Sequence, residues 1–440
     1  MQRDALPAGQ RVSAGRRGRE RPRELKFAAR VGRYEKLTGK TQQAIVGDNK
    51  RMVLRRSVVR SRRPKRTGDF SQRAPRWAGT SARTEVRGSL TSVSEDCASR
   101  HGLLFTCIGR RVQLLQAFRD AAGSLGIQLE IHGTDASVLS PGIHLVDKPH
   151  LVPPIAAENY IDALLDIVVR HGIELLIPLL DFELPLIAAA AERFNDAGCR
   201  ALISTESVVK TCRDKLATFK TLQSAGIDMP QTWLWSEVAQ GEHHQFPYYL
   251  KPRHGSAAKG NYVIHNGEEL RALGRRVPDA LIQEFVSGAE HTLDVYCGFD
   301  GRPRCVVPRK RLEIRTGEVS KSLIVKDADL MAVGRRVAEV LGGCRGVVTV
   351  QCMVTPEGRI RVIEINPRFG GGVPLAIHAG ADFPRWILME LLGRKPRINP
   401  TGFRDDIVML RFDHAVFVPN ASKLARAKRL TNRAPRSGKR

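Results

Sequence analysis

The first regular pattern of hydrophobic positions begins near residue 103 and alternates between short apolar runs and helical spacing. Residues 103–108 form a continuous apolar run of the kind that makes a buried strand, and residues 112–122 then repeat apolar positions at helical spacing, with Gly123 as the expected stop. The same alternation predicts strands and helices at residues 127–131, 160–171, 173–180 and 183–197. Strands that alternate with helices favour a parallel, Rossmann-like sheet.

Further along the chain, the pattern changes to strands joined by short turns. Strands are expected at residues 246–250, 291–298, 302–307 and 407–412, and a core-facing helix at 329–341. Two more apolar runs flank Thr355–Gly358, a Pro/Gly turn of the hairpin type. The predicted fold class therefore combines an α/β part with an α+β part.

The register of the hairpin at residues 355–358 decides which side chains meet. If the hairpin closes on that turn, Val354 lies opposite Arg359 and Gln351 lies opposite Val362. Because side chains alternate with period two, the hairpin presents one polar face and one apolar face.

The polar face of this hairpin is predicted to hold a divalent cation. Glu364 and Asn366 share that face, and Gln351 is expected to lie diagonally beside Glu364. Oxygen donors without Cys or His suit Mg²⁺, whose remaining positions phosphate oxygens would fill. Arg368 follows two residues later, where it could reach an anionic group on that metal. An edge strand with an incidental acid is the alternative interpretation.

Charge and composition divide the chain into a nearly neutral body and two basic ends. The net charge of +26 falls as +17 in residues 1–100 and +8 in residues 421–440, which leaves +1 for residues 101–420. No apolar run reaches the roughly 18–20 residues that a membrane span requires. The eight cysteines include no Cys-x-x-Cys pair, which argues against a zinc cage or a disulfide framework and for reduced thiols in a cytosol. Cys344 and Cys352 fit small core hydrophobes better than nucleophiles.

The two basic ends are expected to be disordered, because Arg-rich sequence without apolar periodicity cannot bury enough surface to offset its chain entropy. This expectation covers residues 1–100 and the tail from Ser422. For residues 1–100, the alternatives are a basic arm for nucleic acid, a transit peptide, or a gene-model extension with translation starting near residue 100. The scarcity of aromatic residues that could stack on bases argues against nucleic acid.

A second set of candidate binding residues precedes the hairpin in the sequence. Lys251 ends an apolar strand, which is an uncommon place for a merely solvated charge. In residues 253–260, small side chains would let backbone amides approach phosphate oxygens beneath a flexible cover. This loop is not a Walker A motif, and no Gly-x-Gly-x-x-Gly follows Ile108, which argues against an NAD site. His243 and His244 are expected to be solvated.

The string Glu364-x-Asn366-Pro367-Arg368 resembles the metal-binding end of the ATP-grasp superfamily. Within it, the chain resembles single modules of the carbamoyl phosphate synthetase large chain, roughly over residues 102–393. The resemblance implies a Rossmann-like pre-ATP-grasp domain followed by a two-lobed ATP-grasp fold. The implied domains are a basic extension over residues 1–100, the pre-ATP-grasp domain over 101–203, the ATP-grasp domain over 204–393, and a C-terminal segment with a basic tail over 394–440.

The same resemblance implies ATP and Mg²⁺ (or Mn²⁺) as cofactors and assigns roles to individual residues. Gln351, Glu364 and Asn366 would hold the metal, and Arg368 and Lys251 would act in catalysis. The residues implied in ATP binding are Lys215, Lys251, Gln283, Glu284, Phe285, Val286 and Glu290.

For three of these contacts, the resemblance also implies which part of the nucleotide is bound. Lys215 resembles the first phosphate-binding lysine of the family. Backbone groups at Glu284 and Val286 would hold the adenine edge, with Phe285 packed nearby, and Glu290 would bind the ribose hydroxyls. Surface charges are the alternative for Lys215 and Glu290.

Cationic side chains outside the nucleotide site are candidates for binding an anionic substrate. Arg110 and Arg111 follow the first predicted strand, at the carboxyl end where such sheets bind ligands. Asp181 and Glu183 are weaker candidates, with a helix-cap role as the alternative. The cationic stretch 308–321 is expected to be a loop that offers Arg309, Arg311, Arg315 and Lys321, with a solvated face as the alternative.

The resemblance implies an ADP-forming ligase that joins a small-molecule carboxylate to an amine (or a thiol) through an acylphosphate. The scattered cysteines and the absence of a long apolar run favour the cytoplasm and no membrane partner. Relatives make a homodimer the expected assembly. Two other functions stay open: a non-catalytic nucleic-acid-binding protein that uses the basic ends, and an ATP-grasp kinase that phosphorylates without ligation. Removing residues 1–100 and 422–440 distinguishes a nucleic-acid-binding protein from an enzyme, because a nucleic-acid binder would lose its salt-dependent affinity. Analysis of the reaction products distinguishes a kinase from a ligase.

Overall fold

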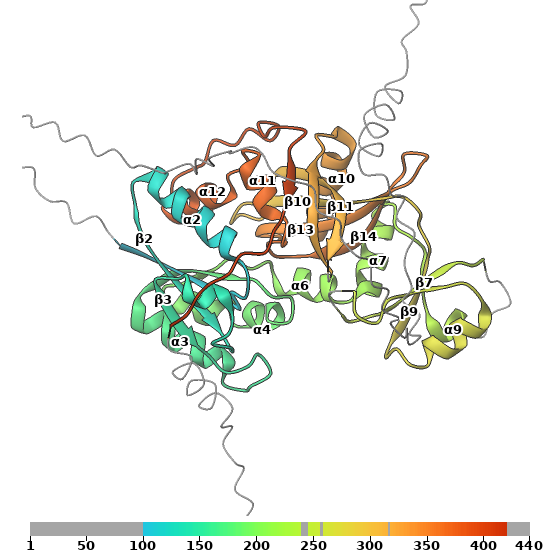
Figure 1. The fold of residues 1–440 in the computed structure, drawn as a ribbon, viewed down its shortest axis with the longest axis horizontal. Helices are drawn as coiled ribbons and strands as arrows, with labels where there is room; N and C mark the ends of the chain where they lie inside the picture. The colour runs from blue at the N-terminus through green and yellow to red at the C-terminus, as the bar shows by residue number, and fades with distance from the viewer. Residues whose placement is uncertain (1–99, 239–244, 256–257, 316, 420–440) are drawn as a thin grey trace, which may run out of the picture. The chain divides into compact units, whose positions relative to one another are not determined.

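A computed structural model describes residues 100–419 except 239–244, 256–257 and 316 (Figure 1). The expectations for the basic ends, and those for His243 and His244, fall outside these described residues apart from Arg100. No helix in the described ranges is long and apolar enough to cross a membrane.

The N-terminal part of the described chain is a five-stranded parallel sheet, as the alternating pattern predicted. Its strand order is β3-β2-β1-β4-β5. The strands are β1 (Arg100–Thr106), β2 (Gln128–Asp135), β3 (Lys148–Leu151), β4 (Ile173–Pro178) and β5 (Arg200–Ala201). A 3-10 turn, η1 (Pro141–His144), precedes β3. The carboxyl ends of β1 and β4 meet at one edge of the sheet, where the polar residues after these strands come together.

The helices that accompany this sheet differ from the predicted ones in two details. They are α2 (Val112–Leu125), α3 (Tyr160–His171), α4 (Leu184–Ala189) and α5 (Ala191–Asp196). Helix α2 continues past Gly123 and ends at Gly126, whose φ of 68° provides the left-handed C-cap. The single helix predicted over residues 183–197 is two short helices that meet at Ala190.

The largest sheet among the described residues is antiparallel and six-stranded, with the order β14-β13-β10-β11-β12-β15. Its strands are β10 (Ala289–Cys297), β11 (Pro303–Arg315), β12 (Glu318–Ile324), β13 (Gly346–Val354), β14 (Ile360–Asn366) and β15 (Val408–Leu410). Helices α7 (Lys215–Ser224) and α10 (Ala328–Leu341) cover one face, where Cys344 and Cys352 are buried among aliphatic side chains as expected. The polar face of β13 and β14 points the other way.

The cationic stretch 308–321 is not a loop, which corrects the prediction. Its described residues form the end of β11 and the start of β12, which pair with each other antiparallel. Acids in the same stretch make this possible, because Glu313 pairs with Lys321 across the two strands at 2.6 Å. A run of like-charged residues is tolerated in strands when opposite charges lie across from it.

A smaller four-stranded sheet forms the second lobe, in the order β6-β9-β7-β8. The strands are β6 (Thr232–Leu234), β7 (Tyr248–Pro252), β8 (Tyr262–Ile264) and β9 (Ala280–Glu284), packed on α9 (Gly267–Gly274). The short helix α8 (Trp235–Val238) packs on the same sheet, whereas α6 (Glu206–Arg213) lies against α4, α7 and β14. The expected two-lobed arrangement is therefore present.

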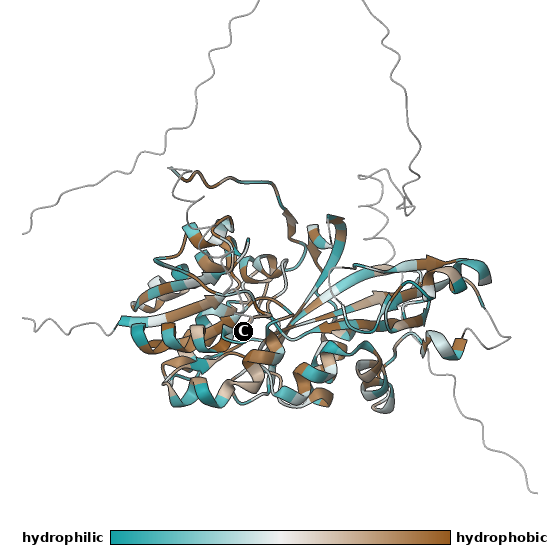
Figure 2. Cartoon of the chain, turned by 90° about the horizontal axis from the view of Figure 1, so that it is seen from below, coloured by the Kyte–Doolittle hydropathy of each residue, from teal (hydrophilic) through white to brown (hydrophobic). Residues whose placement is uncertain are grey.

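One hydrophobic core joins the N-terminal sheet to the chain that follows β14. Helices α11 (Val373–His378) and α12 (Phe383–Leu391) pack beside α2 (Figure 1). Phe118 of α2 contacts Phe369, the residue after Arg368, with ring centroids 6.2 Å apart. This packing brings the Arg368 segment to the carboxyl end of the N-terminal strands. Figure 2 shows hydrophobic and hydrophilic residues interspersed along the visible helices, as expected for helices that bury one face.

Candidate active site

The hairpin predicted around residues 355–358 is formed by β13 and β14, but its register at the turn differs from the predicted one. The N–H of Thr355 donates to the carbonyl of Arg359 at 3.0 Å, and Val354 pairs with Ile360 instead of Arg359. The turn therefore has three residues inside the Thr355–Arg359 pair, with Gly358 at φ 85°. The predicted turn, Thr355–Gly358, has four residues, one more than the observed turn.

A register shift further along the hairpin brings the polar side chains closer than predicted. Between Gln351 and Cys352 the pairing shifts by one residue, so Gln351 lies directly opposite Glu364 and not opposite Val362. The Nδ2 atom of Asn366 donates to Oε1 of Gln351 at 3.4 Å. The three oxygen-bearing side chains of the predicted metal set therefore lie together on the polar face.

Glu290, the predicted ribose ligand, lies next to the same set. Its Oε1 accepts a hydrogen bond from Nε2 of Gln351 at 3.0 Å and from Arg311 at 2.6 Å. Burial raises the pKa of Glu290 and nearby Glu364 adds to the rise, whereas Arg311 opposes it. A second carboxylate therefore lies within the electrostatic range of Glu364.

Lys215 approaches Glu364 from the first turn of α7. Asp214 caps that helix by accepting hydrogen bonds from the N–H groups of residues 216 and 217. This cap fixes the start of the helix and therefore the position of Lys215. The Nζ atom of Lys215 donates to the carbonyl of Gly255 at 3.1 Å and lies 3.7 Å from Oε1 of Glu364. The predicted phosphate-binding lysine thus contacts both the loop after β7 and the predicted metal set.

Lys251 reaches the same place from β7 and is only 4% exposed. Its Nζ donates to Oε1 of Gln283 at 2.9 Å and to the carbonyl of Ile363 at 3.4 Å. Burial, helped by the nearby charge of Lys215, lowers the pKa of Lys251 to about 8, while Glu364 opposes the shift. Two lysines and a carboxylate from three separate elements therefore converge.

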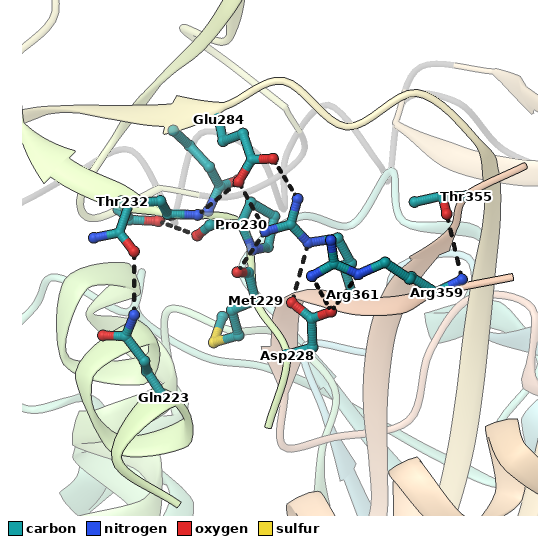
Figure 3. Close-up of polar contacts among 11 residues, drawn as sticks. Gln223, Asp228, Met229, Pro230, Thr232, Glu284, Thr355, Arg359 and Arg361 are labelled. Carbon is teal, nitrogen blue, oxygen red and sulfur yellow. Dashed lines mark hydrogen bonds and ion pairs between the residues drawn. The ribbon is translucent and has the colours of Figure 1, made fainter. Parts of the chain in front are cut away.

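Glu284, the last residue of β9, is held by an ion-pair network (Figure 3). Arg361 of β14 donates to both carboxylate oxygens of Glu284, at 2.5 and 2.8 Å, and also to Asp228. The N–H of Glu284 donates to the carbonyl of Gln231 at 2.9 Å, so one of the backbone groups predicted to hold the adenine edge already has a partner. Phe285 follows and is 39% exposed.

Replacing Arg361 with Met should lower the free energy of unfolding by about 1–3 kcal/mol, the range for lost hydrogen bonds to charged groups. Arg361 is buried and binds Glu284, Asp228 and the carbonyl of Met229. The neighbouring Arg359 binds Asp228 but its side chain is 62% exposed, so Arg359→Met should cost less than about 1 kcal/mol. Urea unfolding of both variants measures the difference, and equal costs would contradict the assigned network.

Arg368 is engaged with the N-terminal domain. Its guanidinium forms two hydrogen bonds to Asp181, at 2.8 and 2.6 Å, and a third to the carbonyl of Phe369. Asp181 follows β4, so this pair connects the predicted metal hairpin to the N-terminal sheet. Glu183 is fully buried, and its carboxylate accepts hydrogen bonds from Tyr160 and from two backbone N–H groups. Glu183 stands at the N-cap position of α4, but its carboxylate caps no N–H of that helix, because the two backbone groups that it binds belong to Leu179 and Leu180.

Arg110 and Arg111 lie after β1, where they line a small pocket with Gly370, Gly371 and Arg411. The acid that faces these arginines is Glu318, 3.7 Å from Arg110, 3.6 Å from Arg111 and 3.2 Å from Arg411. Burial and the nearby charge of Arg368 lower the pKa of Arg111 to about 10. Three arginines that share one carboxylate leave a surplus of positive charge.

Arg309 and Arg311 both lie on the polar face, but Arg309 is wholly enclosed. Its guanidinium forms hydrogen bonds of 2.6 and 2.9 Å to Asp294, and the two side chains are 1% and 0% exposed. The Nη1 atom of Arg309 has no hydrogen-bond partner and lies where a side chain on Gly372 would start. Only glycine at position 372 leaves room for this arginine.

Arg315 and Lys321 are not brought to the site. Both are largely exposed and pair with surface acids, Arg315 with Asp413 and Lys321 with Glu313. Arg315 ends β11, beyond the last residue of that strand that pairs with β10, and Lys321 lies on β12 opposite Glu313.

Local sequence patterns gave little indication of several residues of this site. Asp294 and Arg361 lie in apolar runs that predict strands, and the buried ion pairs that they form join distant segments. Arg411 reaches the pocket because β15 pairs with β12. The charged residue inside the apolar run 291–298 was the one feature that could have suggested a buried partner for Asp294.

Comparison with known proteins divides the chain in the same way as its sheets. Residues 103–202 match the family of PylC-like N-terminal domains, and residues 212–372 match the ATP-grasp domain family. Residues 212–372 form an ATP-grasp domain. The match includes Lys215, Lys251 and the hairpin of β13 and β14. The more specific resemblance to the carbamoyl phosphate synthetase large chain stays a prediction.

Among curated proteins, this chain is similar to the 3-methyl-D-ornithine–L-lysine ligase of Methanosarcina acetivorans. The two are 28% identical over 210 residues, which is 47% of this chain and 52% of that ligase. The ligase of the same name from Methanosarcina mazei is also 28% identical, over 46% of this chain and 49% of its own length. The chain thus spans about half the length of these relatives.

Solved structures share the fold at lower identity. The biotin carboxylase domain of Hydrogenobacter thermophilus 2-oxoglutarate carboxylase, in complex with MgADP, ADP and bicarbonate, has a TM-score of 0.56 and 16% identity over 70% of this chain and 73% of that one. The L-amino acid ligase from Bacillus licheniformis has a TM-score of 0.53 and 20% identity over 66% of this chain and 74% of that one.

Proposed function

We propose that this ATP-grasp protein is an ADP-forming ligase that joins a carboxylate to an amine through an acylphosphate. The observation that carries the proposal is the convergence of Lys215, Lys251 and Glu364, from three separate elements, around the polar hairpin. Relatives in the comparisons are named as ligases of amino acids, which supports amino-acid-like substrates for this chain.

The two lysines would bind and orient the ATP phosphates. Lys215 contacts the loop after β7, and Lys251 is buried behind the hairpin, so both charges are fixed before the nucleotide arrives. Fixed positive charge in a site that excludes water stabilises the charge that gathers on a transferring phosphoryl group, at no cost of reorganisation. Phe285 and Val286 would pack beside the adenine.

Gln351, Glu364 and Asn366 fit a hard divalent cation such as Mg²⁺ (or Mn²⁺). They offer carboxylate and amide oxygens on one face of a hairpin, with neither Cys nor His in the set. When bound, such an ion would neutralise charge on the phosphate oxygens. Glu290, bonded to Gln351, holds the amide of that residue in place.

The arginines near Gly370 and Gly371 would bind the substrate carboxylate. Arg110, Arg111 and Arg411 line the pocket, and Arg368 lies near enough to shift the pKa of Arg111. Planar guanidinium groups suit carboxylate recognition because they can donate two parallel hydrogen bonds. A carboxylate bound there would attack the terminal phosphate of ATP, and the amine would then displace phosphate from the acylphosphate carbon.

The experiment that tests the proposed function is a screen of ATP-to-ADP conversion with pooled amino acids and other small carboxylates. A ligase releases ADP and phosphate only when both a carboxylate and an amine are present, and it forms a condensed product that mass spectrometry detects. Release of ADP with one substrate and a phosphorylated product would favour a kinase instead. No conversion with any pool, in the presence of Mg²⁺, would count against both.

Nucleotide binding should take up protons above pH 8 but not at pH 6.5. Free Lys251 has a pKa of about 8, so it is neutral in part above that value. Bound phosphates favour the charged lysine and raise its pKa, so binding adds a proton between about pH 8 and 10, by up to about one proton per chain. Calorimetry in buffers of different ionisation enthalpy measures the uptake.

Lys251→Met should abolish this proton uptake, whereas Lys220→Met should leave it unchanged. Lys220 is an exposed lysine on α7, the helix that also carries Lys215. Proton uptake that persists in Lys251→Met would show that another group titrates and would contradict the role assigned to Lys251.

A further inference from the structure

Three histidines lie together in the N-terminal domain, separate from the proposed ligase site. His132, His150 and His171 each offer a ring nitrogen, and these three atoms all lie within 4.8 Å of one another. The Nδ1 atom of His132 and the Nε2 atom of His150 are 2.9 Å apart. Nothing in the proposed ligase chemistry uses this cluster.

The fold explains why three residues far apart in sequence meet here. Strands β2 and β3 are parallel and in a register that pairs His132 with Lys148 and Thr134 with His150, so the two histidines are diagonal neighbours on one face. Helix α3 lies against the same sheet and ends at His171, where Gly172 at φ 59° turns the chain away (Figure 1). The end of α3 therefore delivers the third imidazole.

Glu130 orients the first of these histidines. Its Oε2 lies 3.2 Å from Nε2 of His132, which directs the other nitrogen, Nδ1, toward the cluster. A carboxylate that accepts the outer N–H of a metal-binding histidine is the usual support for such a ligand, because it fixes the tautomer and the ring orientation. Arg100 and Lys148 in turn pair with Glu130.

The electrostatic environment favours neutral imidazoles, the form that binds metals. His132 is fully buried, His150 is half-buried and His171 is exposed, so the cluster is closed on one side and open to solvent on the other. Burial lowers the pKa of His132, and it lowers that of His150 to about 4. At neutral pH both therefore have a lone pair to offer.

We propose that His132, His150 and His171 bind one Zn²⁺, with water in the fourth position. Imidazole nitrogens suit Zn²⁺ and are poor ligands for Mg²⁺, so this site would be chemically distinct from the oxygen set of the ligase centre. Bonds of 2.0–2.1 Å in a tetrahedron place ligand nitrogens about 3.3 Å apart, so His132 and His150 need to move apart by only a few tenths of an ångström. The bound ion would tie β2, β3 and the end of α3 together.

The test is a zinc titration of the full-length protein after removal of metals with a chelator. Competition against a chromophoric zinc indicator should show one tight site per chain, and bound Zn²⁺ should raise the melting temperature. Co²⁺ in the same site should give the intense visible absorption of a tetrahedral complex.

His171→Gln should weaken zinc binding at least tenfold, and because His171 is exposed this variant should fold normally. His265→Gln replaces another exposed histidine, on the second lobe, and should bind zinc like the wild-type protein. His150→Gln provides a second variant within the cluster. Absence of a stoichiometric site in the wild-type protein, or equal affinity in all three variants, would overturn the proposal.

Discussion

Glu364→Gln should reduce ATP turnover on the order of 10²–10³-fold while the protein remains folded, a loss typical of removing one preorganised charged group from a transition state. Glu364 lies opposite Gln351 and 3.7 Å from Lys215, so it joins the predicted metal set to the phosphate-binding side chains. Glutamine keeps the shape but removes the negative charge that a divalent cation requires. The rate is measured with the substrate pair identified in the pooled screen.

The matched control is Glu357→Gln, in the turn of the same hairpin. Glu357 is exposed and contacts no residue of the proposed site, so its replacement should leave turnover within about twofold, as for most surface substitutions. Raising the Mg²⁺ concentration should partly rescue Glu364→Gln if the metal affinity has fallen. Undiminished turnover in Glu364→Gln would reject the assignment of this carboxylate.

Asp294→Ala should lower the free energy of unfolding by about 3–5 kcal/mol, the cost of leaving a buried charge without its partner. Asp294 and Arg309 are both enclosed and are joined by two hydrogen bonds. Removing the carboxylate leaves the Arg309 guanidinium, whose Nη1 already lacks a partner, with no counter-charge in the protein interior. Urea or thermal unfolding measures the loss.

The double variant Asp294→Leu/Arg309→Met distinguishes a charge effect from a packing effect. Replacing both members of a buried pair with apolar residues of similar size is often nearly neutral for stability. We therefore expect the double variant to recover most of the stability lost in Asp294→Ala. A double variant as unstable as the single one would show that packing, and not the unpaired charge, dominates.

The sequence could predict the sheets because period-two and helical patterns are local properties of the chain. The N-terminal α/β pattern and the hairpin of β13 and β14 both appear in the structure at nearly the expected positions. The shared face of Glu364 and Asn366 followed from the same periodicity.

What the sequence could not give is any contact that depends on pairing between distant segments. The shift that places Gln351 opposite Glu364 arises from one extra residue in β14, which no local pattern marks. Arg368 meets Asp181 because α2, α11 and α12 share a core, and that packing has no signature near either residue. The roles of these residues in binding and catalysis stay predictions.

The cationic stretch 308–321 shows why charge runs are hard to interpret. Arg309 and Arg315 look alike in sequence, yet one is fully buried against Asp294 and the other is exposed. The difference comes from position along β11. Arg309 lies in the part of the strand that pairs with β10, and Arg315 lies beyond it. Charge patterning alone therefore could not divide the candidates.

The central claim is a nucleotide site in which phosphates and a divalent cation bind between Lys215, Lys251 and the hairpin, and calorimetric titration with a non-hydrolysable ATP analogue tests it most directly. We expect one analogue per chain with Mg²⁺ present, at least tenfold weaker binding when the metal is chelated, and loss of this metal dependence in Glu364→Gln. An analogue that gives no heat of binding, or that binds equally well with and without Mg²⁺, would contradict the account.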